Sequence, residues 1–184
     1  MSHWKKTKTT EQKVGFKTVT IKEFEMPDGR AEVYTTWNKA NTNSVATIAL
    51  TKDNQVVIAR QFRPGPEAMF DEIPGGGVDP GEDLESAARR ELREETGYET
   101  DEPFQYLGVT CRDAYTNERN HYFLARRCTQ TVLQSLDATE HIEITLISVK
   151  QLFENAKSAK MSDSLDLLLA YKDLEEILDA EKSH

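Results

Sequence analysis

The chain has 184 residues, which is the length of one domain and at most two. Hydrophobic residues make up 38% of it and charged residues 30%, with six prolines and nine glycines, so collagen-like and low-complexity classes are excluded and one core can form. Asp and Glu number 32 against 23 Lys and Arg, for a formal net charge of −9. We therefore expect no nucleic-acid partner, and a phosphate-containing ligand would need a divalent metal ion to offset charge repulsion.

Cysteine content and hydropathy favour a cytoplasmic protein. Cys111 and Cys128 are too few for the disulfide framework of a small secreted domain. The N-terminal residues contain no apolar stretch of the kind that marks a secretory signal. The longest apolar run, Val45–Leu50, is interrupted by Thr47 and is far shorter than the ~20 residues that a membrane helix needs. We therefore expect no membrane partner.

Alternating, β-branched stretches predict strands along much of the chain. Lys17–Met26 and Ala31–Trp37 flank the turn sequence Pro27-Asp28-Gly29, which predicts a hairpin. Its few apolar residues indicate that the hairpin packs on something else, such as a second copy of the chain. The further strands that we predict are Val45–Thr51, Gln55–Arg63, Phe104–Cys111, His121–Arg127 and His141–Val149.

Two amphipathic helices are predicted among these strands. The first runs from about Glu82 to Thr96 and ends at Gly97, and the second is the tail Ser162–Leu178. The apolar stripe of the first helix consists of Leu84, Ala87, Ala88 and Leu92. Many strands with one helix in the middle and another at the end predict a single α+β domain.

The polar face of the first helix carries an excess of carboxylates. Glu91, Glu94 and Glu95 are three and four residues apart, so they crowd one side of the helix, and Arg90 can pair with Glu94. The segment Gly81–Gly97 contains six acidic residues and three arginines. Oxygen ligands that converge in this way suit Mg²⁺ or Mn²⁺. The alternative is an ordinary solvated helix face.

The wider spacing around these glutamates resembles the Nudix box. Gly76 is followed after five residues by Glu82, and after seven more by Arg90-Glu91-Leu92-Arg93-Glu94-Glu95-Thr96-Gly97-Tyr98. Eight of the nine specified positions are filled as in the family pattern, and the ninth holds Tyr98 where the family prefers an aliphatic packing residue. The box also runs from a loop into a glycine-terminated helix, as the motif requires.

The resemblance implies a fold and an activity. Nudix proteins are α/β/α sandwiches with a mixed sheet, and they hydrolyse a nucleoside diphosphate linked to another moiety with Mg²⁺, or alternatively Mn²⁺. By position, Glu91 and Glu95 would be the main metal ligands, with Glu94 beside them and the Gly75 carbonyl completing the set, while Arg90 would orient the glutamates. We expect residues 1–184 to form one Nudix domain, with a hairpin arm over 1–42 and a catalytic core with a C-terminal helix over 43–184.

The segments that flank the box resemble the ADP-ribose and nucleotide-sugar pyrophosphatase branch. These segments are Gln61-Phe62-Arg63-Pro64, Glu72-Ile73-Pro74-Gly75-Gly76 and Asp79-Pro80-Gly81-Glu82. In that branch the arginine matching Arg63 reaches the substrate phosphates, and a surface ion pair is the alternative for Arg63. Arg60 is a weaker candidate, since strand residues an odd number apart face opposite sides.

That branch also takes its general base from a late loop, which here is Leu136–His141. Glu140 matches the catalytic position best, and Glu143 and Asp137 are the next candidates. A carboxylate that accepts a proton from the attacking water typically contributes roughly 10²–10⁴-fold in rate. An ordinary solvated loop acid is the alternative for Glu140.

One departure from the branch bears on the substrate. ADP-ribose-specific members usually have a proline after the box where this chain has Thr110–Asn117, a segment without proline. Tyr115 in it resembles the tyrosine of some diadenosine polyphosphate hydrolases, and its ring could stack on a base or pack under the loop. We therefore keep both ADP-ribose and GDP-mannose as substrates of a nucleoside-diphosphate-sugar hydrolase. The alternatives are a diadenosine polyphosphate or nucleoside triphosphate hydrolase and a non-catalytic nucleotide-sugar sensor.

The N-terminal arm bears on the oligomeric state. In this branch the hairpin commonly crosses to a partner subunit, which implies a homodimer. Trp37, at the end of the predicted hairpin, and Trp4 are either core residues or residues that stack on a base, and both readings stay open. Trp37 is therefore included among the candidate substrate-binding residues.

Overall fold

The computed structural model describes residues 3–15, 17–162 and 164–182, and these form two compact units. Unit 1 contains the described residues up to Ser44 together with Thr110–Asn120. Unit 2 contains Val45–Val109 and the described residues from His121 onward. None of the described helices combines the length and the apolar composition that crossing a membrane requires. The interpretation of the whole chain as one domain with an arm over 1–42 stays a prediction.

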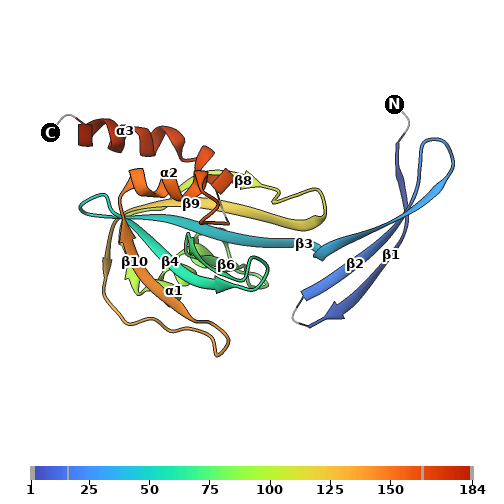
Figure 1. The fold of residues 1–184 in the computed structure, drawn as a ribbon. Coiled ribbons are helices and arrows are strands. Elements are labelled where there is room, and N and C mark those ends of the chain that lie inside the picture. The colour runs from blue at the N-terminus through green and yellow to red at the C-terminus, as the bar shows by residue number, and fades with distance from the viewer. Residues whose placement is uncertain (1–2, 16, 163, 183–184) are drawn as a thin grey trace. The chain divides into compact units, whose positions relative to one another are not determined.

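Figure 1 shows the elements in chain order. They are β1 (Lys5–Val14), β2 (Lys17–Glu25), β3 (Ala31–Thr51), β4 (Val56–Arg63), β5 (Ala68–Glu72), β6 (Gly75–Gly77), α1 (Leu84–Thr96), β7 (Tyr98–Glu99), β8 (Gln105–Thr110), β9 (Thr116–Gln130), β10 (Ile142–Ile147), α2 (Val149–Lys157), the 3₁₀ helix η1 (Ser164–Leu168) and α3 (Tyr171–Lys182). Strand β3 begins in unit 1 and ends in unit 2.

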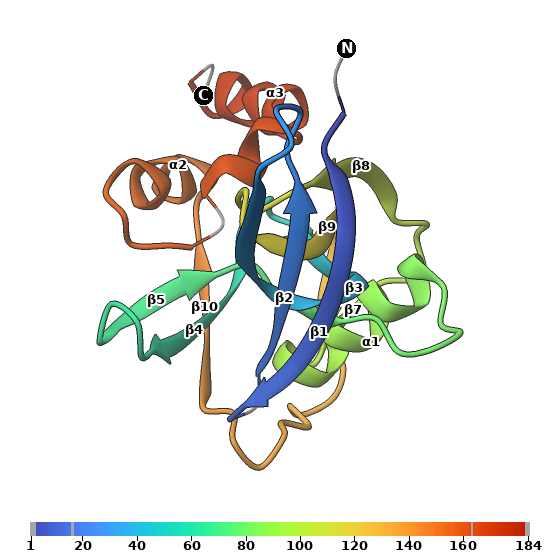
Figure 2. The same ribbon diagram turned by 90° about the vertical axis from the view of Figure 1, so that its right-hand side faces the viewer.

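In unit 1, β1, β2 and the first part of β3 pair in antiparallel order, and Figure 2 shows β1 and β2 side by side. The predicted hairpin is therefore present, but sequence analysis missed β1. All residues of β1 are exposed, and its sequence is dominated by Lys and Thr, so there is no apolar alternation to detect. Cross-strand charge pairs help to align it, as in Lys8 and Glu23, which lie 3.4 Å apart.

One face of this three-stranded sheet carries five apolar side chains among polar and charged ones, which include Lys8, Lys17 and Glu23. The strand register places on this face Val14, Val19, Ile21, Val33 and Trp37. Val14, Val33 and Trp37 are 53%, 60% and 51% exposed. We call these five residues the apolar face of unit 1.

Unit 2 is a sheet between helices. Alternate residues of β3 point to opposite sides, so that Ile48 and Leu50 enter one core and Val45 and Ala49 enter the other. Helix α1 covers the second core, and α2, η1 and α3 cover the first, as Figures 1 and 2 also show. The predicted α+β class and the α/β/α sandwich are therefore confirmed.

The first predicted helix is confirmed with a slightly later start. It begins at Leu84 because Asp83 is the N-cap, whose carboxylate accepts a hydrogen bond from the Ser86 backbone N–H at 3.0 Å. It ends at Gly97, which has φ +72°, and a Cβ there would lie 2.1 Å from the Val132 carbonyl oxygen. Glycine is therefore required by both the backbone conformation and the close approach.

The prediction for the C-terminal part was wrong in two places. The last strand ends at Ile147 because the Ser148 side chain accepts a hydrogen bond from the Gln151 N–H and caps α2, a helix that sequence analysis missed. The tail is η1 followed by α3 and not one helix from Ser162, and residue 163 lies outside the described residues. Upstream of α1, the three glycines Gly75–Gly77 form β6, which pairs with β3.

Candidate active site

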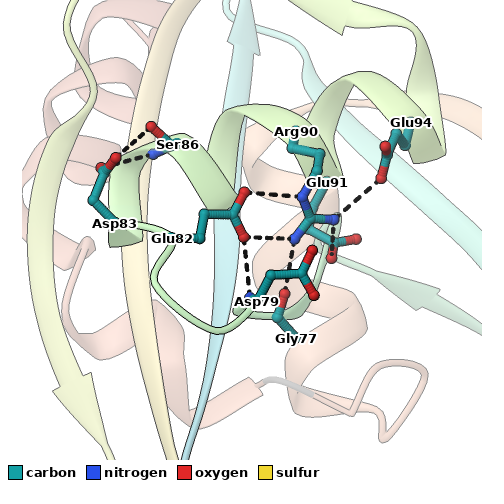
Figure 3. Close-up of polar contacts among 8 residues, drawn as sticks. All are labelled: Gly77, Asp79, Glu82, Asp83, Ser86, Arg90, Glu91 and Glu94. Atoms are coloured by element: carbon teal, nitrogen blue, oxygen red, sulfur yellow. Dashed lines mark hydrogen bonds and ion pairs between the residues drawn. The ribbon is translucent and has the colours of Figure 1, made fainter.

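Arg90 is the centre of a network of carboxylates on α1 and in the loop before it (Figure 3). Its Nε and Nη2 each donate to Glu82 at 3.0 Å, and its Nη1 donates to Glu91 at 2.8 Å and to Glu94 at 3.1 Å. Nη2 also donates to the Gly77 carbonyl at 2.9 Å. The Glu82 carboxylate, followed by Glu91 and Glu94, raises the pKa of Arg90, so the guanidinium stays charged. Arg90 therefore contacts Glu82, Glu91 and Glu94 at once, and its role in orienting the glutamates for a metal stays a prediction.

The Glu91 carboxylate lies directly beside the backbone of the glycine loop. A Cβ on Gly76 would lie 2.5 Å from Glu91 Oε1, so any larger residue there would displace the Glu91 carboxylate. The Glu91 side chain is 14% exposed, and burial raises its pKa, against the opposing effect of Arg90. Glu94 and Glu140 add to the rise through charge repulsion.

Glu95 is the most buried of the three glutamates, with 5% exposure. Its Oε2 accepts a hydrogen bond from the Gly75 N–H at 2.9 Å. Burial raises the pKa of Glu95 to about 8, the Gly75 N–H opposes that rise, and the carboxylates of Glu91, Glu140 and Glu72 add to it. A cation placed here would relieve both the desolvation and the repulsion.

The late loop brings Glu140 to these helix carboxylates. Glu140 is half-buried, and its Oε2 accepts a hydrogen bond from the Asp137 N–H at 2.9 Å. Its negative charge raises the pKa of both Glu91 and Glu95. Glu143, by contrast, lies on β10 opposite Arg60, and its charge raises the pKa of that guanidinium. We call Glu91, Glu95 and Glu140 the acidic cluster.

The acidic cluster suits a hard divalent cation by its chemistry. It offers carboxylate oxygens whose mutual repulsion is offset by one guanidinium, that of Arg90. In the described part of the chain, no three Asp, Glu, His or Cys side chains are already gathered as a metal centre. Glu91 and Glu94 pair with Arg90 instead, so a cation would compete with this guanidinium. Gly75 contributes its N–H to Glu95, and the role of its carbonyl stays a prediction.

Arg63, at the end of β4, forms a two-pronged ion pair with Glu72. Its Nε donates to Glu72 Oε1 at 2.8 Å, and its Nη2 donates to Oε2. Glu72 is only 3% exposed, and Gln61 at 3.1 Å and Ser162 at 2.9 Å also donate to it. No role for Glu72 follows from the sequence, because its partner Ser162 is 90 residues away in the chain. Since the charge of Glu72 acts on Glu95, the pair lies near the acidic cluster.

Arg60 belongs to a different network. Its Nε donates to Asp71 Oδ1 at 2.6 Å, and Asn155 of α2 donates to Asp71 Oδ2 at 2.7 Å. Asp71 is 8% exposed, so Arg60 neutralises a buried carboxylate that attaches α2 to the sheet. The opposite directions expected for Arg60 and Arg63 agree with these different partners, and a substrate-binding role for Arg60 stays a prediction.

Trp37 and Tyr115 belong to unit 1, whereas the acidic cluster belongs to unit 2. The backbone N–H of Trp37 donates to the backbone carbonyl of Tyr115 at 2.7 Å, and the Tyr115 side chain is exposed. Trp37 lines a pocket of about 250 Å³. The other residues around this pocket are Lys17, Asn38, Arg112, Asp113, Thr116 and Glu118. An exposed indole among charged and amide groups has the chemistry to bind a planar polar ring.

Comparison with known proteins identifies the family. The model of the NUDIX domain matches residues 40–168, so the chain belongs to the Nudix family. It is 28% identical to the ADP-ribose pyrophosphatase of Bacillus subtilis (strain 168) over 166 residues, which cover 88% of each chain. It is also 28% identical to the methanol dehydrogenase activator of Bacillus methanolicus over 177 residues, 94% of this chain and 95% of that one.

A solved structure gives the same fold. The crystal structure of an ADP compounds hydrolase superposes with a TM-score of 0.68 at 20% identity, covering 90% of this chain and 96% of that chain. The expected family, the likeness to its ADP-ribose pyrophosphatase branch and the fold class are therefore confirmed. The chain is a Nudix hydrolase, and by class a pyrophosphohydrolase.

Proposed function

We propose that this Nudix hydrolase uses Mg²⁺, with Mn²⁺ as the alternative, to cleave the phosphoanhydride bond of nucleoside diphosphate sugars. The products would be a nucleoside monophosphate and a sugar phosphate, and ADP-ribose and GDP-mannose represent the substrate class. The observation that carries the proposal is the acidic cluster, in which Glu95 is buried beside Glu91 and Glu140 with too little positive charge to balance them. The name of the Bacillus subtilis relative supports the substrate class.

Glu91, Glu95 and Glu94 would hold the cation. When bound, it would polarise a phosphoryl oxygen and offset the charge of the departing phosphate. Arg90 keeps Glu91 and Glu94 on the same side of α1 through Nη1, and its remaining donors fix it to Glu82 and to the Gly77 carbonyl. The guanidinium thus sets the direction of the ligands without being one of them.

Glu140 would accept the proton from the attacking water, and Arg63 would bind the substrate phosphates. Glu140 suits this role better than Glu143, because its charge acts on the ligands of α1 and that of Glu143 acts on Arg60. A bidentate pair such as Arg63 with Glu72 fixes the plane of the guanidinium, which is the group of choice for recognising phosphate.

We propose that the exposed ring of Tyr115 in unit 1 stacks on a nucleotide base, with Trp37 as a further candidate. Both rings are more than half exposed, at 57% and 51%. We also propose that the apolar face of unit 1 packs against a second copy of the chain in a homodimer, because Val14, Val33 and Trp37 on it are each at least half exposed in the single chain.

A substrate panel tests the activity. Purified protein with Mg²⁺ is incubated with ADP-ribose, GDP-mannose, ADP-glucose and diadenosine polyphosphates, and the products are identified by chromatography. We expect a nucleoside monophosphate and a sugar phosphate from at least one sugar nucleotide, and none after chelation. Absence of turnover for every sugar nucleotide would overturn the proposal.

A second candidate activity is hydrolysis of diadenosine polyphosphates or nucleoside triphosphates. The exposed side chain of Tyr115 favours it, because the ring is accessible for stacking on a base. The same panel decides between the two activities, since the second predicts a preference for substrates with three or more phosphates. A non-catalytic sensor, the remaining alternative, would bind a nucleotide sugar without releasing products.

A further inference from the structure

The carbonyl groups at the end of α1 accept hydrogen bonds from the segment that leads into the late loop. The last carbonyls of a helix have no partners within the helix, so they need donors from elsewhere. The Glu94 carbonyl accepts from the Ser135 N–H at 2.8 Å, the Glu95 carbonyl from Gln134 Nε2 at 2.5 Å, the Thr96 carbonyl from Gln130 Nε2 at 3.4 Å and the Gly97 carbonyl from the Thr131 N–H at 3.0 Å.

Gln134 does more than complete the helix end. Its Nε2 also donates to the carbonyl of Ile142, at 3.2 Å, where β10 begins. One amide group therefore joins the end of α1, the start of the loop and the first residue of the next strand. Residues 135–141, which include Glu140, lie between Gln134 and Ile142, so this bond closes the loop.

We propose that Gln134 is a positioning residue that sets the place of Glu140 relative to Glu91 and Glu95. The proposal deepens the proposed function and rests on it, because Glu140 is the general base there. The hydrogen bonds inside the loop join Asp137 and Glu140 to each other, whereas Gln134 joins the loop to the elements on either side. The backbone of Glu95 and the loop of Glu140 are thus held by the same side chain.

The chemistry of the amide suits this role. A glutamine Nε2 has two protons, and the two carbonyls of Glu95 and Ile142 can take one each. Removal of the amide would leave both ends of the loop less constrained without changing any group that touches the substrate. Because a displacement of about 1 Å at a reacting group can cost ~10²-fold in rate, turnover should respond strongly.

The test replaces Gln134 by a side chain of similar length that has no hydrogen-bond donor. In Gln134→Met, kcat for ADP-ribose with Mg²⁺ should fall at least about 10-fold, with KM within about threefold of the wild-type value, because the loop moves and the phosphate-binding residues do not. The matched control is Gln130→Met, which removes the weaker 3.4 Å bond to the same helix end from strand β9. Both of its constants should change less than threefold. Unchanged kcat in Gln134→Met would overturn the proposal.

A double-mutant cycle separates positioning from a general loss of stability. If Gln134 acts through Glu140, Gln134→Met should cause no further loss of kcat in a Glu140→Gln background. The same fractional loss in both backgrounds would show a merely structural role and overturn the proposal.

Hydrogen exchange separates failure of this inference from failure of the proposed function. The backbone amides of Asp137 and Glu140 should exchange faster in Gln134→Met than in wild-type protein, while those in the middle of α1 stay unchanged. Equal loop exchange in the two proteins would overturn the anchoring role, whatever the activity. Wild-type turnover in Glu140→Gln would overturn the choice of base instead.

Discussion

Glu95 is a buried acid that lowers the stability of the folded state. Its carboxylate is nearly inaccessible, its pKa is raised to about 8 chiefly by burial, and Glu91 and Glu140 add repulsion. The Gly75 N–H is a hydrogen-bond donor that a neutral amide oxygen would also satisfy. Because desolvated like charges lower the stability of the folded state, we infer that this residue is kept for function and not for folding.

We predict opposite effects on activity and stability for Glu95→Gln. Turnover should fall at least ~10²-fold, as for the loss of a metal ligand. In chelator, the variant should melt at the wild-type temperature or about 2–4 °C higher, which is the size of a ~1 kcal/mol change in a domain of this length. Calorimetry and a product assay give the two values.

The control for this prediction is Glu85→Gln on the same helix. Glu85 is paired with Arg89 at 2.8 Å, so its neutralisation removes a favourable contact and should not raise the melting temperature. A lower melting temperature in Glu95→Gln than in wild-type protein would contradict the interpretation that Glu95 is costly to the fold.

At the level of single residues, the sequence predicts those candidate site residues that lie at helical spacing on one helix. Glu91, Glu94 and Glu95 follow from helical spacing, because one backbone element positions them all. Glu72 and Gln134 could not be predicted, since their roles depend on Ser162 and on the Glu95 carbonyl, which come close only in the folded chain. No periodic signal marks such contacts.

Among the elements, the hairpin of β4 and β5 presents two arginines to two different networks. Arg60 and Arg63 both lie on β4. Their partners, Asp71 for Arg60 and Glu72 for Arg63, lie on the antiparallel strand β5. Both carboxylates are buried, and each is also bound by a residue from the segment that begins with α2, Ser162 for Glu72 and Asn155 for Asp71. This hairpin therefore offers a matched pair of variants.

We predict that Glu72→Gln weakens substrate binding more than it slows turnover. The neutral side chain keeps its shape but no longer fixes the Arg63 guanidinium by charge, so KM should rise about 10-fold, equivalent to ~1.4 kcal/mol. Steady-state kinetics with ADP-ribose measures KM and kcat separately.

The matched control is Asp71→Asn, which weakens the Arg60 network instead. It should lower the melting temperature, because Arg60 and Asn155 lose a charged partner, and leave KM within about threefold. An equal rise in KM in both variants would show that the effect comes from general loosening of the hairpin and contradict the role of Glu72.

The elements differ in how far the sequence predicts them. The end of helix α1 could be predicted to the residue from its apolar stripe and its terminal Gly97, whereas its start lies two residues later than predicted because Asp83 is the N-cap. Strand β1 gives no such signal, since pairing with β2 and not burial holds its exposed residues. Helix α2 was missed because Ser148 lies directly after a β-branched run that predicts a strand.

For the whole molecule, the apolar face of unit 1 is the feature that a single chain leaves unexplained. A sheet with one buried and one exposed face normally has polar residues on the exposed side. Here Val33 and Trp37 are 60% and 51% exposed on the same face. In a twofold dimer the same patch lies on both subunits, so a self-complementary apolar face can be buried by a second copy.

We predict that a further charge on this face, at Val33 of the outer strand β3, disrupts the dimer. In Val33→Glu, two like charges would be buried together, so analytical ultracentrifugation should show the monomer where wild-type protein sediments at twice that mass. The control is Lys13→Glu, an exposed residue on the opposite face of the same sheet, which should leave the dimer intact. A wild-type protein that is monomeric at micromolar concentration would contradict the dimer. Dissociation of both variants would instead show that net charge, and not the apolar face, controls association.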